Sequence, residues 1–75
     1  MRTAEQFAHV HTQALRFIKF HNKNVWIVPH SDGYNLSILR PEAYELPVGT
    51  QAIEVGLPVD ADNNYTIYSE ISSIK

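Results

Sequence analysis

Only one stretch of this sequence has the spacing of an amphipathic helix, and the remainder is made of short β-type runs. Between residues 3 and 21, apolar side chains recur every three or four positions, and polar side chains fill the other side. Thr3 followed by Gln6 is a capping-box pattern, and Asn22 can end the helix in the left-handed conformation. A lone helix must bury its apolar stripe on something else, so the pattern predicts a helix packed on a sheet.

The first two β-type runs form a predicted hairpin. Residues 25–28 contain no polar interruption, which is typical of a central strand, and Pro29 ends its pairing on one side because proline has no amide donor. Asp32-Gly33 is a turn signal, and residues 34–39 alternate as a return strand should.

A short helical turn and two further strands complete the predicted fold. The turn is expected at 41–45, and the strands at 51–55 and 65–74. In the last strand, Tyr65, Ile67 and Ile71 are predicted to share one face, with Tyr68 on the other. The fold class is therefore α+β, with one N-terminal helix on a three- to four-stranded antiparallel sheet, in the order α-β-β-β-β. The whole chain, residues 1–75, is predicted to be one domain.

Periodicity also predicts the apolar core. Its expected members are Phe7, Val10, Ala14, Phe17, Ile18, Val25, Ile27, Leu36, Ile38, Ile53, Val55 and Ile67. A chain of 75 residues buries only about 60% of the surface that its unfolded form exposes. Little core can be given up to form a cleft, which argues against a self-contained enzyme.

No residue pattern predicts catalysis, a cofactor or a metal site. The chain has no cysteine, which excludes disulfides, thiolate catalysis and zinc–sulfur sites. His9 and His11 are two apart on the predicted helix and point in different directions, so they cannot share an ion. Asp60, Asp62 and Asn64 resemble the start of a calcium loop, but this loop lacks the required glycine and the bidentate glutamate. Such Asp/Asn-rich loops usually bond their own backbone.

Charge is distributed unevenly within a net charge of -2. Residues 1–40 hold five bases against two acids, whereas residues 41–75 hold one base, Lys75, against six acids. Carboxylates interleaved with tyrosines suit a basic protein partner. The alternative is that the uneven charge distribution only keeps the chain in solution. The predicted partner-binding residues are Tyr44, Glu54, Asp60, Asp62, Tyr65, Tyr68 and Glu70.

The expected function is therefore a small non-catalytic protein-binding module. Its size and acidity suggest an inhibitor or adaptor acting on a basic nucleic-acid-handling protein, of the kind made by phages and mobile elements. The alternative is weak nucleic-acid binding by Arg16, Lys19 and Lys23, which the sequence pI of about 6.0 disfavours. A third reading is a subunit whose active site forms only on oligomerisation.

Two further expectations concern association and location. The last strand is predicted to be a pairing edge, for a partner or for a second copy across a two-fold axis. The N-terminal residues resemble neither a signal peptide nor a membrane span, so a cytoplasmic location is expected, in the host cytoplasm if the protein is phage-encoded.

Overall fold

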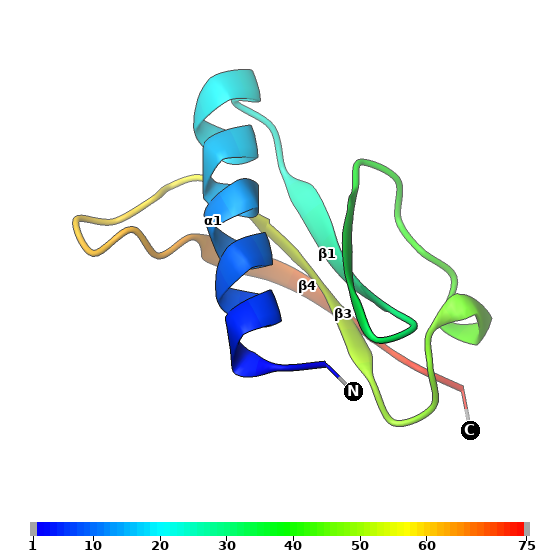
Figure 1. Cartoon of the computed structure of the whole chain (residues 1–75). Coiled ribbons are helices and arrows are strands. Elements are labelled where there is room, and N and C mark those ends of the chain that lie inside the picture. Colours follow the sequence, from blue (N-terminus) through cyan, green and yellow to red (C-terminus); the bar gives the residue numbers. More distant parts are fainter. Residues whose placement is uncertain (1, 75) are drawn as a thin grey trace.

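The computed structural model describes residues 2–74 as one helix and one antiparallel sheet. The elements are α1 (Ala4–His21), β1 (Val25–His30), β2 (Gly33–Ser37), the short 3-10 helix η1 (Ala43–Glu45), β3 (Gln51–Gly56) and β4 (Thr66–Ser72). The four strands are ordered β2-β1-β3-β4, and α1 lies on one face of the sheet (Figure 1). The predicted α+β class and element order are confirmed. Within residues 2–74, no helix has the length and apolar character needed to cross a bilayer.

Helix α1 begins and ends as the sequence predicts. The Thr3 hydroxyl accepts a hydrogen bond from the Gln6 amide at 3.1 Å, and the Gln6 side chain accepts one from the Thr3 amide at 2.8 Å. At the other end, Asn22 takes the left-handed conformation (φ 56°, ψ 41°), and its amide donates to the Ile18 carbonyl at 2.8 Å. Both ends of the helix thus satisfy backbone groups that would otherwise have no intrahelical partner.

The main core lies between α1 and the sheet. Its fully buried members are Val10, Ala14, Ile18, Val25, Ile27 and Val55, all of them predicted. Phe17, Leu36 and Ile53 are half-buried and pack against this cluster.

Phe7, Ile38 and Ile67 are exposed, so their assignment to the core was wrong. The predicted return strand over 34–39 ends early, at Ser37, and Ile38 lies beyond the sheet. The Ser37 hydroxyl donates to the Leu39 carbonyl and accepts from the Leu39 amide, which turns the chain away from β1.

A second, smaller core lies on the face of the sheet opposite α1. Its buried members are Trp26, Leu46, Ala52 and Ile71, with Val28 and Ala43 packed against them. The segment between β2 and β3, which includes η1, supplies Leu46 and Ala43. The sheet is therefore covered in part on one face by α1 and in part on the other by this segment.

The β1–β2 hairpin differs from the prediction at its turn. His30 pairs with Gly33, so the two turn residues are Ser31 and Asp32, and Gly33 belongs to the strand. Ser31 takes the positive φ of 48° that the turn requires. The expected effect of Pro29 is confirmed, because it pairs with Tyr34 of β2 but lies beyond the last residue of β1 that pairs with β3.

A β-bulge in β4 overturns the predicted alternation over residues 65–74. Glu54 pairs with Ser69 and Val55 pairs with Ile67, which leaves Tyr68 as an extra residue. Paired residues share a face, so Ile67 lies on the α1 side with Val55, whereas Ile71 lies on the other side with Ala52. Ile67 and Ile71 therefore do not share a face.

Gly56 makes room for this bulge. A Cβ on Gly56 would lie 3.1 Å from the Tyr68 Cε2 atom and 1.8 Å from the Asn24 Oδ1 atom. Because Gly56 follows Val55 in the strand, this position faces away from α1. The Tyr68 ring therefore packs over Gly56 on the face opposite the helix.

Candidate functional site

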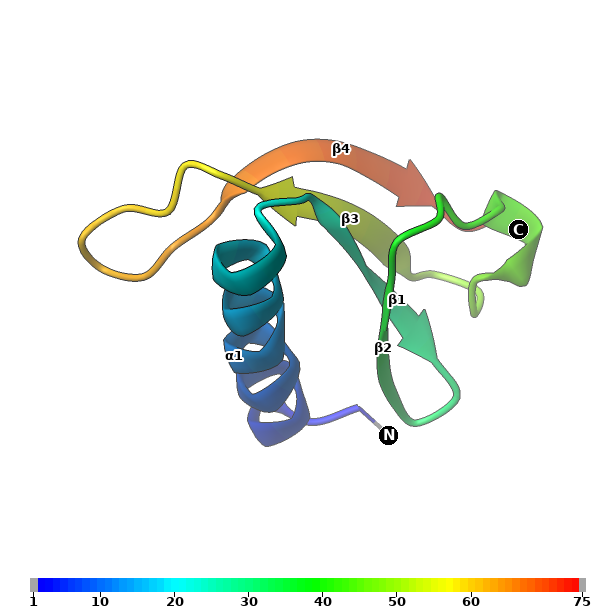
Figure 2. The same ribbon diagram turned by 90° about the horizontal axis from the view of Figure 1, so that it is seen from above.

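Helix α1 covers only part of its face of the sheet. It packs on β2 and β1 and, over fewer residues, on β3, while β4 lies beyond β3 at the edge. Figure 2 shows α1 on the concave side of the curved sheet, with β2 and β4 at the two edges. A helix about 10 Å wide spans roughly two strands spaced about 4.8 Å apart. Val55 of β3 is 0% exposed in the core under α1, whereas the α1 side of β4 and of residues 51–53 of β3, called here the open half-face, is left without a helix.

A groove of about 570 Å³ opens on this side of the sheet. Its apolar lining includes Ile27, Pro29 and Ile53 from the sheet and Phe7 from α1. Its polar lining is Arg2, Tyr34, Thr50, Gln51, Ser72 and Ser73, with Gly49 beside them. Apart from Arg2, whose guanidinium donates to the Ser31 carbonyl at 2.7 Å, none of these side chains carries a charge. An apolar floor with a polar rim is typical of a binding site.

The groove lies where β1 and β3 separate. Ile27 and Ile53 are the last residues paired between these strands. If the pairing continued for two more residues, Pro29 would lie opposite Gln51. Proline has no backbone N–H to donate to Gln51, so the pairing of β1 with β3 stops before it. Sequence reasoning missed this groove, although Pro29 was the signal that could have located it.

Four aromatic rings form a chain of contacts along α1, from Tyr34 on β2 to Tyr65 just before β4. Ring centroids are 5.6 Å apart between Tyr34 and Phe7, 6.3 Å between Phe7 and His11, and 4.7 Å between His11 and Tyr65. Burial raises the pKa of the Tyr65 phenol above its ordinary value of 10.0. Tyr65, a predicted partner-binding residue, therefore also packs against the helix.

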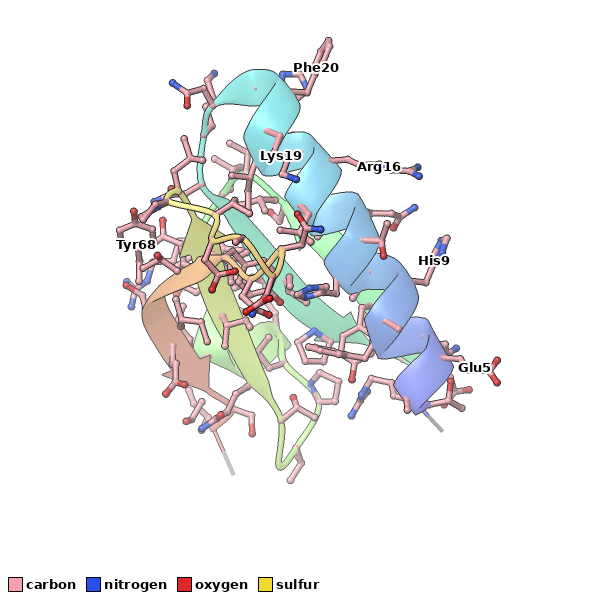
Figure 3. The ribbon with its side chains drawn as sticks, turned by 90° about the vertical axis from the view of Figure 1, so that its left-hand side faces the viewer. Glu5, His9, Arg16, Lys19, Phe20 and Tyr68 are labelled. Carbon is pink, nitrogen blue, oxygen red and sulfur yellow. The ribbon has the colours of Figure 1, made fainter. Side chains whose placement is uncertain are left out.

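The other predicted partner-binding residues fall on separate surfaces. Glu70 lies on the α1 side, opposite Ile53, whereas Glu54 lies on the other face, opposite Ser69 and Trp26. The two carboxylates are thus on neighbouring strands but on opposite faces. Figure 3 shows Tyr68 on the far side of the sheet from α1. Tyr44, on η1, lies at the opposite end of the sheet from the loop that carries Asp60 and Asp62 (Figure 2).

Asp60 holds its own loop together. Its Oδ1 atom accepts hydrogen bonds from the Asp62 amide at 2.9 Å and from the Asn64 amide at 3.0 Å. These bonds, with the one from Asn64 first, lower the pKa of Asp60 below its ordinary value of 3.8. The carboxylate is therefore part of the loop structure, as the Asp/Asn-rich composition suggested.

This role of Asp60 gives a pH dependence with a defined sign. Because the folded-state pKa is lowered, the stabilisation is present above the ordinary value of 3.8 and is lost as pH falls through the lowered folded value. We expect the NMR shifts of the Asp62 and Asn64 amides to titrate with an apparent pKa below 3.8. Asp60→Asn keeps an acceptor oxygen but does not titrate, so this step should vanish in that variant. A midpoint at or above 3.8 in the wild type would contradict the assignment.

The three basic residues considered for nucleic-acid binding, Arg16, Lys19 and Lys23, lie in different surroundings. The Lys19 ammonium donates to the Asn63 side chain at 2.9 Å and so turns toward the loop of Asp60 and Asp62. Arg16 extends away from the sheet (Figure 3), and Lys23 follows the helix end. Lys19 thus links α1 to the β3–β4 loop.

Neither a metal centre nor a known relative indicates a chemistry for this site. Among residues 2–74, no group of three or more His, Cys, Asp or Glu side chains is placed to hold a metal ion. No protein-family model matches the chain, and neither the curated proteins nor the solved structures contain a significant match.

Proposed function

We propose that this protein is a non-catalytic binding module that takes a basic segment of another protein onto its open half-face. The observation that carries the proposal is the incomplete cover of this face by α1. Ile67 lies on the α1 side of the sheet yet is 54% exposed, and Ile53, opposite Glu70 on β3, is only half-buried. Apolar side chains that are exposed on this face, or that line the groove at its end, gain free energy when a partner removes them from water.

The charge distribution supports a basic partner. Residues 41–74 hold six carboxylates and no base, and Lys75 lies outside the described residues. Glu70 belongs to the open half-face itself, and the loop of Asp60 and Asp62 closes one end of β4. Electrostatic complementarity of this kind favours encounter with a cationic surface. An inhibitor or adaptor of a basic nucleic-acid-handling protein, acting in the cytoplasm, is the class of role that we propose.

Binding on the face is favoured over pairing of two β4 edges. β4 is an edge strand, but it contains a bulge at Tyr68 and a carboxylate, Glu70, directed to the inner face of the sheet. Bulges and inward-pointing charges are features by which natural proteins prevent edge-to-edge pairing. A homodimer through this strand is accordingly the weaker proposal.

Site-specific photo-crosslinking in extract of cells that express the protein tests this proposal. A photoreactive phenylalanine analogue at Ile67 should give discrete protein adducts that unlabelled wild-type protein competes away. The same analogue at Phe20, which is 83% exposed on α1, provides the control and should give few adducts. Equal adducts from both positions would refute the proposal. Nuclease-sensitive adducts from the analogue placed at Arg16 would refute it as well and would favour the nucleic-acid alternative.

A further inference from the structure

We infer that the partner segment is a short amphipathic α-helix that lies beside α1 on β3 and β4. This inference rests on the proposed function, because it specifies what the open half-face binds. At the end of the sheet where Gln51 pairs with Ser72 and Ile53 with Glu70, the uncovered part is about two strands across, roughly 10 Å, which matches the diameter of one helix. A second helix there would complete a two-layer structure of which α1 forms one half.

The surface offers side chains to a partner rather than backbone. The half-buried Ile53 and the exposed Ile67 belong to the face of the sheet, where hydrogen-bonding groups of the strands point sideways, and the buried Ile27 and Pro29 lie beneath the groove. An extended peptide would need a run of free strand backbone, and the β4 edge is interrupted by the Tyr68 bulge. A helix satisfies its own backbone and needs only apolar contact.

A second copy of α1 is a poor occupant for this surface. The side of α1 that faces away from the sheet carries His9 and Arg16, both exposed (Figure 3). Its apolar stripe is already buried on the sheet of its own chain. The occupant must therefore come from another protein and bring an apolar face of its own.

Length and charge define the helix further. The seven residues of β4 span about 23 Å, which corresponds to about 15 residues of helix. Glu70 borders the path of that helix, whereas the single lining base, Arg2, is already engaged at the Ser31 carbonyl. A helix with an apolar stripe flanked by Lys or Arg is complementary to this arrangement.

Peptide titration followed by NMR tests the inference. The probe is a stapled 15-residue helix with Leu at positions i, i+3, i+4 and i+7 and Lys elsewhere. We expect it to shift the resonances of Ile53, Ile67 and Glu70 and to spare Glu54 and Tyr68. A peptide of the same composition with its four Leu in alternation, at i, i+2, i+4 and i+6, and a stapled helix with Glu in place of Lys, should each bind at least roughly tenfold more weakly.

Two charge-reversal variants form a matched pair for this titration. Glu70→Lys should weaken binding of the basic helix roughly three- to tenfold, and Glu54→Lys, on the opposite face, should leave it unchanged. Both changes alter the net charge equally, so a general effect of charge would move both. Equal weakening in the two variants, or shifts confined to Glu54 and Tyr68, would overturn the inference.

The outcomes separate this inference from the proposed function. If the alternating peptide binds the same face as tightly as the stapled helix, or if no basic peptide binds, the helical occupant is wrong. Crosslinking from position 67 would still report a protein partner in either case. If that crosslinking fails while the basic helix binds in the expected way, the helix preference stands and the cellular role is refuted.

Discussion

Trp26→Ala is expected to destabilise the protein by about 3–5 kcal/mol. The Trp26 side chain is 5% exposed and packs with Leu46, Ala52 and Ile71 on the face opposite α1. Ala52 is too small to fill the space that the indole leaves, so a cavity would remain under the β2–β3 segment. Domains of this size are stable by only about 5–10 kcal/mol, so the loss takes up much of the total.

Urea unfolding and hydrogen exchange together test this prediction. The midpoint should fall sharply, and amides of residues 43–50 should exchange faster even under native conditions, because Leu46 loses its main contact. Tyr44→Ala is the aromatic control, since Tyr44 is 73% exposed on η1 and its loss should change stability by less than about 0.5 kcal/mol. Equal effects of the two substitutions would show that the second core contributes little.

The elements of the fold could be predicted because their signals are local. The Thr3 capping box, the Asn22 cap and the helical stripe each involve residues within a few positions of one another. The β-type runs are likewise local, and the break in pairing at Pro29 follows from the chemistry of one residue. All four strands of the sheet were therefore predicted, and the structure confirms them.

What could not be predicted depends on contacts between distant segments. The Tyr68 bulge arises from the register of β4 on β3 and from the space over Gly56, and it moves Ile67 and Ile71 to different faces. Leu46 is buried only because its segment returns across the sheet to Trp26.

The candidate site shows the same limit. Of the residues predicted to bind a partner, Tyr65 and Glu70 border the open half-face, whereas Glu54 and Tyr68 lie on the opposite face; a binding role for any of them stays a prediction. The sequence indicated which residue types were available. It contained no local signal for how far α1 would extend over the sheet.

Ile18→Ala is expected to cost about 2–5 kcal/mol and to separate α1 from the sheet more than any other single truncation in the helix. The Ile18 side chain is 0% exposed and lies in the cluster that joins α1 to Val25, Ile27 and Val55. Phe20→Ala, two positions along the same helix, removes a larger side chain that is 83% exposed and should change stability by less than about 0.5 kcal/mol. Thermal unfolding followed by circular dichroism distinguishes the pair. If Phe20→Ala lowered the melting temperature as much as Ile18→Ala, the face of α1 that packs on the sheet would be misassigned. The open half-face is defined by the part of the sheet that α1 leaves uncovered, so its residues would then have to be reassigned.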